Sequence, residues 1–334
     1  MLQKDRSIHA TRKPRLHQAR RRIWDQGFGT KALQSYQERV KGKVELLAQN
    51  IGRSTGQPID CRQLFLYFGF DVMGDIAFGE GFGMLESNKP HAVMNIMRSG
   101  IYVLGRLSPV SWFITILASL PGANADWAKL EQFSEEQVLK RSKLDRDESD
   151  VSRSCHATKR TVTNFHKVMS KLIDAARDPE DKDKIDMHWL SGDALVIIIA
   201  GSDTVSAALT FLFHHLALLP QHVQQLREEL SNVDITDNRQ LRQLRHLNAV
   251  INETLRLYPP VPTALLRQTP PEGLRVSERY VPGGVTISTP LWSLGRLESS
   301  YTRAGEFLPE RWYPGSGMVK DQSGFAPFLS GTSF

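Results

Sequence analysis

The amino-acid sequence predicts a mainly α-helical protein with a small β region late in the chain. Apolar residues recur at helical spacing over most of the first 258 residues. The segment 191–219 contains no proline and is expected to form one long central helix that Pro220 ends. Beyond Pro262 the pattern changes to short runs rich in β-branched residues, separated by turns that contain Pro and Gly.

The first helices are expected between residues 15 and 75. Residues 15–50 are helical in pattern, with a break at 27–29 and a new start capped by Thr30. Asp60 can cap the next helix, which we expect to continue through Asp75. That helix is apolar on nearly every side and is therefore predicted to be buried.

Further helices are expected up to a pair of prolines that follows Tyr258. Residues 91–142 predict two or three helices, interrupted at prolines. Residues 143–165 lack apolar periodicity and predict an irregular exposed loop or insertion. After the central helix, two more helices are expected over 221–232 and 238–258.

The β region is predicted from two short runs, 274–276 and 285–288, with residues 282–284 as the turn. The sequence contains no internal repeat. We therefore expect one domain over residues 1–334.

Composition excludes several classes of protein. Hydrophobic residues make up 40% and charged residues 23%, which are ordinary values for a globular protein. Two cysteines exclude a disulfide scaffold and any four-cysteine metal site. The longest apolar stretch, 101–120, is interrupted by Gly, Arg and Pro, and the chain opens on charged residues. We therefore expect no transmembrane anchor and no secretory signal in this chain.

Basic residues concentrate at the start of the chain. Residues 1–31 hold nine Lys and Arg against two acids, whereas the whole chain has a formal charge of +6. Such a cluster can face nucleic acid, an anionic membrane surface or a bound polyanion, or form a solvated helix face. No nucleic-acid motif accompanies it, so we expect no nucleic-acid partner.

The central helix carries the segment Ala200-Gly201-Ser202-Asp203-Thr204 in an apolar setting. A glycine costs about 1 kcal/mol relative to alanine inside a helix, so Gly201 needs a reason. Small residues let a ligand approach the backbone, the Thr204 hydroxyl can bond back to the Ala200 carbonyl, and Asp203 adds an acid. This arrangement suits proton delivery to a bound small molecule. The alternative is a helix-packing site of small residues with a solvated Asp203.

A second group of residues pairs charges on a helix. Glu253 and Arg256 share one helix face, and most such pairs are exposed and contribute about 0.2–0.5 kcal/mol. Apolar neighbours favour partial burial here, and a buried guanidinium needs more than one carboxylate. Arg311, in the run Phe-Leu-Pro-Glu-Arg-Trp, is a candidate for the same cluster.

Taken in this order, the motifs resemble those of the cytochrome P450 family of haem-thiolate monooxygenases. The resemblance comprises Ala-Gly-Ser-Asp-Thr, Glu-x-x-Arg, Pro-Glu-Arg-Trp and Phe325-Ala-Pro-Phe328-Leu-Ser-Gly331. The early Arg-Arg-Ile-Trp-Asp-Gln-Gly-Phe and the late Pro-Glu-Arg-Trp-Tyr are similar to the filamentous-fungal, secondary-metabolism branch. The resemblance runs from about residue 8 to the end. It implies an incomplete cytochrome P450 fold with a long central helix and a Glu-x-x-Arg helix.

The resemblance implies roles for the matching residues. Asp203 and Thr204 match the oxygen-activating pair, and Ala200 and Gly201 match the lining of the oxygen groove. The structural charge triad of the family matches Glu253, Arg256 and Arg311. The residues that hold the haem propionates match His17, Arg21 and Arg267. Positions that line the substrate pocket match Val196, Ile197, Val261, Thr263 and Ala264.

The haem-binding loop departs from the family pattern Phe-x-x-Gly-x-x-x-Cys-x-Gly. Phe328 and Gly331 are in register, and the axial cysteine is expected directly after Phe334. Neither Cys61 nor Cys155 lies in such a loop, and we expect Cys61 to be a small buried hydrophobe. We therefore identify no metal ligand in the chain. Residues 295–296, Gly-Arg where such sequences commonly carry His-Arg, are a smaller departure.

The resemblance implies insertion of one oxygen atom from O₂ into a lipophilic small molecule of fungal secondary metabolism. Haem is the implied cofactor, and NADPH–cytochrome P450 reductase is the implied partner, at the endoplasmic reticulum membrane for full-length members. Because the axial cysteine has no match, we expect a truncated, catalytically inactive domain that is cytoplasmic or unstable. Two alternatives stay open. One is a haem-free remnant that binds partners or lipophilic ligands, and the other is a faulty gene model of an active full-length enzyme.

Overall fold

A computed structural model describes residues 7–11, 13–107, 116, 125–154, 168–177 and 186–328. The chain forms two compact units, which we call unit 1 (Met1–Asp203) and unit 2 (Thr204–Thr332). The boundary falls inside one long helix, α9 (Met187–Leu218). The predicted fold class, mainly α with a small β region, is confirmed. One domain over 1–334 stays a prediction.

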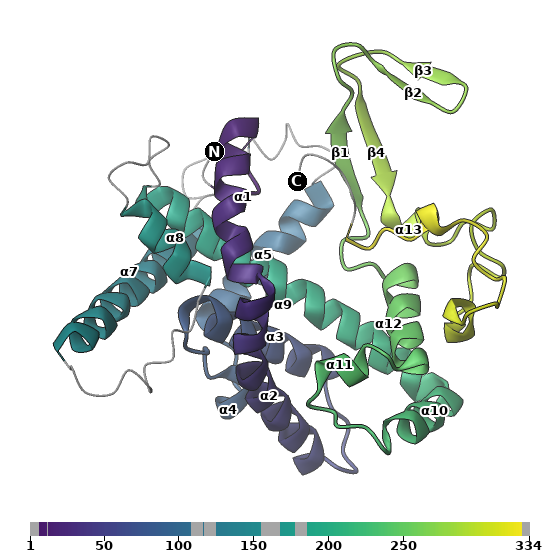
Figure 1. The fold of residues 1–334 in the computed structure, drawn as a ribbon, viewed down its shortest axis with the longest axis horizontal. Helices are drawn as coiled ribbons and strands as arrows, with labels where there is room; N and C mark the ends of the chain where they lie inside the picture. The colour runs from purple at the N-terminus through teal and green to yellow at the C-terminus, as the bar shows by residue number, and fades with distance from the viewer. Residues whose placement is uncertain are drawn as a thin grey trace. The chain divides into compact units, whose positions relative to one another are not determined.

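Unit 1 is helical throughout its described part (Figure 1). Its helices are α1 (Pro14–Phe28), α2 (Thr30–Arg53), α3 (Cys61–Phe78), α4 (Met84–Ser87), α5 (Ala92–Leu107), α7 (Ala125–Ser154), α8 (Val168–Ala176) and the first part of α9. Helix α3 forms the core, because every residue from Leu64 to Asp71 is buried. The predicted cap is confirmed, since the Asp60 carboxylate accepts a hydrogen bond from the backbone N–H of Gln63 at 3.0 Å.

Three expectations for unit 1 need correction. Gly29 ends α1 and also begins α2, so the predicted cap, Thr30, is already the first helical residue. Cys61 is exposed rather than buried, because it is the first residue of α3 and lies outside its buried stretch. Helix α7 continues to Ser154, through part of the loop predicted over 143–165, and residues 155–165 lie outside the described residues. The segment from Ala125 to Ser154 contains no Pro or Gly and many good helix formers, so it stays helical without apolar periodicity.

Unit 2 begins with the second part of α9 and adds short helices and strands. The elements are α10 (Pro220–Leu230), α11 (Asn238–Leu241), α12 (Arg245–Leu257), β1 (Ala264–Gln268), β2 (Leu274–Val276), β3 (Arg279–Val281), β4 (Thr286–Pro290), α13 (Leu291–Leu294), and the 3₁₀ turns η2 (Pro309–Trp312) and η3 (Gln322–Gly324). The helix predicted over 238–258 is thus divided into α11 and α12. Asp237 caps α11 by accepting a hydrogen bond from the backbone N–H of Arg239 at 2.8 Å.

The described β structure of unit 2 consists of two antiparallel pairs. Strand β1 pairs with β4, with Ala264 opposite Pro290 and Gln268 opposite Thr286. Strand β2 pairs with β3, and this hairpin continues from the end of the β1–β4 pair (Figure 1). The two predicted runs coincide with β2 and β4, but each pairs with a strand that was not predicted. Strand β1 lacks β-branched residues and so gave no strand signal. Strand β3 is as short as the predicted β2, and nothing in its composition explains why it was missed.

Helix α9 has the length and composition of a membrane span. Among the described helices it is the only one that meets both criteria, and 28% of its most apolar stretch is buried inside the structure. The core helix of a soluble protein meets the same criteria. This helix is therefore weak evidence for a span.

Candidate functional site

Glu253, Arg256 and Arg311 lie together at the centre of unit 2. Arg256 donates two parallel hydrogen bonds to Glu253, from Nε to Oε2 and from Nη2 to Oε1, each at 2.8 Å. Arg311 donates from Nε to the same Oε1 at 3.3 Å. None of the three side chains has any exposed surface. Because paired, charge-assisted hydrogen bonds are strong and directional, this cluster holds α12 and η2 in one arrangement.

The remaining hydrogen-bonding groups of the cluster are also satisfied. Glu253 accepts from the backbone N–H of Leu308 at 2.8 Å and from Nε1 of Trp312 at 3.0 Å. The two guanidiniums donate to five backbone carbonyls, those of Gly295, Thr302, Arg303, Ala304 and Glu306. We expected a buried guanidinium to need more than one carboxylate. Backbone carbonyls between α13 and η2 supply the other acceptors instead.

Gly295 is required by the close approach of two backbone segments. A Cβ atom built at Gly295 would lie 2.1 Å from the carbonyl oxygen of Arg256, which no side chain can tolerate without movement. In return, the Gly295 carbonyl accepts a hydrogen bond from Nη1 of Arg256. The close contact with Arg256 therefore explains why this chain has glycine at position 295, where similar sequences commonly carry His.

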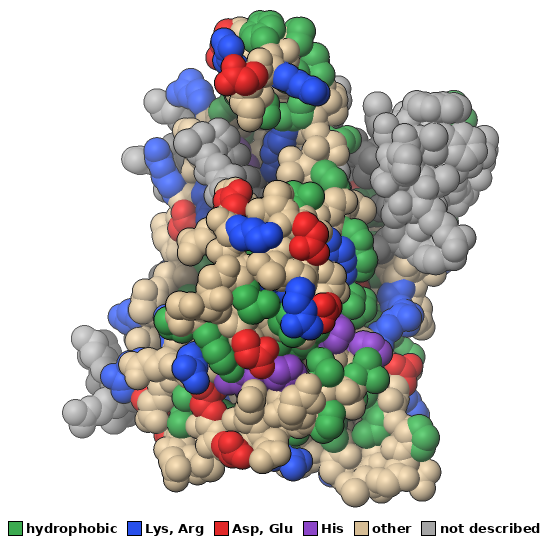
Figure 2. All heavy atoms as spheres, turned by 90° about the vertical axis from the view of Figure 1, so that its right-hand side faces the viewer, with side chains coloured by type: hydrophobic (Ala, Val, Ile, Leu, Met, Phe, Trp, Pro, Cys, Tyr) green, Lys and Arg blue, Asp and Glu red, His purple; other side chains and the backbone are tan. Residues whose placement is uncertain are grey.

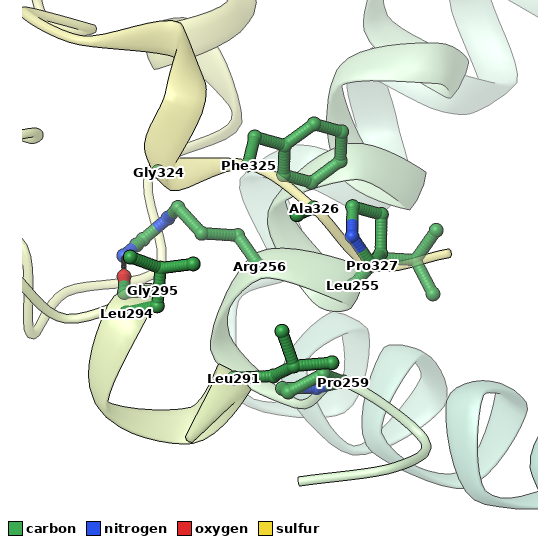
Figure 3. Close-up of a pocket in the computed structure, with 10 residues that line it drawn as sticks. All are labelled: Leu255, Arg256, Pro259, Leu291, Leu294, Gly295, Gly324, Phe325, Ala326 and Pro327. Carbon is green, nitrogen blue, oxygen red and sulfur yellow. Dashed lines mark hydrogen bonds between the residues drawn. The ribbon is translucent and has the colours of Figure 1, made fainter. Parts of the chain in front are cut away.

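A small pocket borders this contact, with Leu294 and Gly295 on one side and Phe325, Ala326 and Pro327 on another (Figure 3). Its volume, about 10 Å³, is close to the space that one water molecule needs. The pocket is too small for an organic substrate. It is a packing boundary between α12 and the segment that leads to Phe328.

The small residues of α9 contact α3 within unit 1. A Cβ atom at Gly201 would lie 2.3 Å from the sulfur of Met73, and one at Gly69 would lie 2.7 Å from the carbonyl oxygen of Ser202. The two helices therefore approach each other closely at this point. The alternative of a helix-packing site accounts for Gly201 here, whereas Ala200 is exposed.

Asp203 and Thr204 follow directly on α9, and both side chains are half-buried. Asp203 is the last residue of unit 1, and Thr204 is the first residue of unit 2. The predicted pocket residues differ in exposure. In unit 1, Val196 is half-buried and Ile197 belongs to the core; in unit 2, Val261 and Thr263 are exposed, and the side chain of Ala264 lies outside the described residues.

The predicted propionate-binding residues are solvent-accessible to different degrees. On α1, His17 is half-buried, and Arg21 is exposed and donates from Nε to Asp25 at 2.7 Å. In unit 2, Arg267 lies on β1 and is exposed, with Nη1 donating to the Leu266 carbonyl at 3.1 Å. Exposed guanidiniums suit the binding of carboxylates, and the propionate role of these three side chains stays a prediction.

No metal-binding group is found in the part of the chain that the structure describes. No three His, Cys, Asp or Glu side chains within it are arranged to hold a metal ion. Cys61 begins a helix, as described above, and is not in a haem-binding loop. Cys155 and Gly331 lie outside the described residues.

Sequence reasoning missed a group of histidines in unit 2. Figure 2 shows histidine side chains close together among hydrophobic ones, on the side of the molecule where α10 and α12 lie. The rings of His222 and His246 are both buried, and their centroids are 5.2 Å apart. Nδ1 of His246 lies 2.7 Å from the Tyr313 hydroxyl, and Nδ1 of His222 lies 3.7 Å from Glu310. Burial lowers the pKa of His246, and the neighbouring His222 lowers this pKa further.

Sequence reasoning also overlooked Arg20 and Asp193, which are buried in unit 1 and contact each other. Arg20 was one basic residue among many in the first 31. A usable signal was present, since Asp193 is an acid in an apolar helix and Arg20 shares a helix face with Trp24.

Comparisons of structure define the class of protein. Two solved structures share the fold, although both are under 25% identical. The retinoic-acid-bound cyanobacterial CYP120A1 has a TM-score of 0.73 and 19% identity, covering 98% of this chain and 68% of that chain. The cytochrome P450 CYP102L1 has a TM-score of 0.74 and 21% identity, covering 98% and 69%. The fold is that of a cytochrome P450.

Comparisons of sequence identify the family. The cytochrome P450 family model matches residues 1–332, and the chain belongs to this family. Tryprostatin B 6-hydroxylase of Aspergillus fumigatus is 36% identical over 332 residues, covering 97% of this chain and 56% of that protein. Cytochrome P450 monooxygenase sthD of Phaeosphaeria nodorum is 38% identical over 326 residues, covering 96% and 66%. The chain thus spans 56% to 66% of the length of these relatives.

Proposed function

We propose that the protein containing this chain is a haem-dependent monooxygenase that inserts one oxygen atom from O₂ into a lipophilic small molecule of fungal secondary metabolism. The observation that carries this proposal is the family match over 1–332, shared with fungal monooxygenases that include a hydroxylase. The buried Glu253–Arg256–Arg311 cluster supports it, because the charge triad of the family is assembled in this chain.

The cofactor follows from the same match. Haem would supply the redox chemistry that activates oxygen, and NADPH–cytochrome P450 reductase would supply the electrons. His17 and Arg21 on α1, and Arg267 on β1, are the side chains that would bind the propionates. We propose the endoplasmic reticulum membrane as the location of the whole protein, as for full-length members of the family.

Asp203 and Thr204 of α9 would transfer protons to the reacting oxygen. The Thr204 hydroxyl can hold a proton at Oγ1, and the adjacent Asp203 carboxylate can replace it from the solvent side. Both are half-buried, so they can contact an apolar pocket and water in turn. Val196, which is half-buried in unit 1, would supply apolar surface that excludes water and favours a lipophilic substrate.

The test uses the whole protein with reductase, NADPH and isotopically labelled oxygen gas, supplied with lipophilic secondary metabolites. We expect one labelled oxygen atom in the product. Thr204→Ala should still bind substrate but release reducing equivalents as hydrogen peroxide, since positioned proton transfer contributes about 10²–10⁴-fold. Thr210→Ala is the matched control, because the Thr210 hydroxyl donates to the Ser206 carbonyl at 2.7 Å on the same helix. Absence of the label from every product contradicts the proposed activity. Equal product per electron in both variants contradicts the role of Thr204.

A further inference from the structure

Asp193, in the first part of α9, joins three segments of unit 1. Its side chain is fully buried. Oδ1 accepts a hydrogen bond from the backbone N–H of Ile8 at 2.7 Å, and Oδ2 accepts one from Nε1 of Trp24 at 3.2 Å. Oδ2 also lies 3.8 Å from Nη2 of Arg20. One carboxylate therefore connects the segment 7–11, helix α1 and helix α9.

Arg20 is held on two sides. It is 4% exposed, and its guanidinium carbon lies 3.8 Å from the ring centroid of Trp189, one turn before Asp193 on α9. A cation that is shielded from water interacts strongly with the face of a Trp ring. Burial raises the pKa of Asp193, and the charge of Arg20 opposes this rise. The charge of Arg20 therefore favours the ionised form of Asp193.

Helix α1 packs mainly against α8, and the contacts with Asp193 add a second constraint on how α1 is rotated about its axis. Arg20 and Trp24 are four residues apart, so they share the face that α9 receives. His17 and Arg21 are also four residues apart, and their face is displaced from the first by about 100°. Arg21 is accordingly exposed while Arg20 is buried. If α1 turned, the positions of His17 and Arg21 would change together.

We propose that Asp193 is a positioning residue for the cofactor: it fixes the rotation of α1 and so presents His17 and Arg21 to the haem propionates. This inference rests on the proposed function, in which these two side chains bind the propionates. Asp193 itself is fully buried within unit 1 and acts only through α1.

The first experiment needs no cofactor. In the full chain, Asp193→Asn keeps the size of the side chain but removes its charge. We expect amide hydrogen exchange in α1 to speed up on the order of tenfold or more, while exchange in α3 stays unchanged. Asp174→Asn is the matched control, because Asp174 is 61% exposed on α8 and the change in charge is the same. Unchanged exchange in α1 of Asp193→Asn overturns the proposal.

A milder variant covers the case in which Asp193→Asn does not fold. Trp24→Phe keeps an aromatic ring beside Phe28 and removes the indole N–H that donates to Asp193. Exchange in α1 should again become faster, by a smaller factor than in Asp193→Asn. Exchange identical to that of the parent overturns the proposal.

The second experiment tests the connection to haem. Hemin is titrated into the full chain, and the Soret absorption reports its affinity. We expect Asp193→Asn to weaken binding about tenfold or more, as outer residues that orient ligands typically do. In a chain that already carries His17→Ala and Arg21→Ala, the same substitution should have no further effect. An equal loss in both backgrounds overturns the proposal, since Asp193 then does not act through these side chains. If His17→Ala and Arg21→Ala leave affinity unchanged, the propionate role fails with the proposed function, and the exchange data alone decide whether Asp193 fixes α1.

Discussion

Removal of Arg256 should destabilise unit 2 more than any exposed charge does. Arg256→Ala deletes both charge-assisted hydrogen bonds to Glu253, leaving Arg311 at 3.3 Å as the remaining cation. It also removes the donor from three buried or half-buried carbonyls, those of Gly295, Ala304 and Glu306. Breaking a buried ion pair on one side costs about 3–5 kcal/mol. Because whole domains have about 5–15 kcal/mol of stability, this loss should remove a large share of the free energy of unfolding.

The assay is urea unfolding of the full chain, followed by circular dichroism, together with the yield of soluble protein. The chain provides a matched control in Arg303, which pairs with Glu306 at the same i,i+3 spacing but is 57% exposed. Arg303→Ala should unfold at nearly the same urea concentration as the parent, since exposed pairs contribute little. Arg256→Lys should fall between the two, because an ammonium keeps the charge but cannot donate two parallel bonds. Equal midpoints for Arg256→Ala and Arg303→Ala would show that the cluster does not stabilise the fold.

Three further predictions follow from the geometry. The lowered pKa of His246 favours the neutral ring in the folded protein, so its contribution to stability should be complete above the unfolded pKa of about 6.5 and be lost as pH falls through the folded pKa. The urea midpoint should therefore decrease between neutral and mildly acidic pH. In His246→Asn this decrease should be smaller. Gly295→Ala should lower the free energy of unfolding by about 1–3 kcal/mol, because the new Cβ would lie 2.1 Å from the carbonyl oxygen of Arg256. Gly305→Ala is the control and should melt like the parent, because a Cβ at Gly305 meets no atom within 4 Å. Gly201→Ala should lower the free energy of unfolding, because the new Cβ would meet the sulfur of Met73. Adding Met73→Ala should recover part of that free energy. If the effects of the two substitutions are additive, Gly201 and Met73 do not pack directly against each other.

The part of the fold that the sequence predicts well depends on local signals. An aspartate directly before a helix is an effective cap, because its carboxylate needs only a backbone N–H three residues later. Asp60 accepts such a bond from Gln63. The central helix expected over 191–219 likewise ends at Leu218, just before Pro220, for local reasons. The break between α1 and α2 was also visible, although the shared Gly29 left no position for a separate cap at Thr30.

The part that was missed depends on partners far along the chain. The sequence pairs Glu253 with Arg256 through their spacing, but it does not show that backbone carbonyls complete the shell of Arg256. Arg20 and Arg21 look alike in the sequence, and only the packing of α1 against its neighbouring helices makes one buried and the other exposed. The role of Gly201 could not be decided from the sequence either, because a ligand groove and a close contact between helices both require a small residue at this position.

The cluster around Glu253 also has a consequence for the order of folding. The chain between α13 and η2 has little regular structure, and its inward-facing carbonyls are bound by the side chains of Arg256 and Arg311. The contacts of Arg256 with this segment join residues 39 to 50 positions apart, so a long loop must close before they form. We expect helix α12 to form locally and early, and this segment to become ordered only when α12 presents its arginine. Interactions that form after the rate-limiting barrier mainly slow unfolding. The buried arginines therefore act chiefly on the lifetime of the native state rather than on the speed with which it is reached.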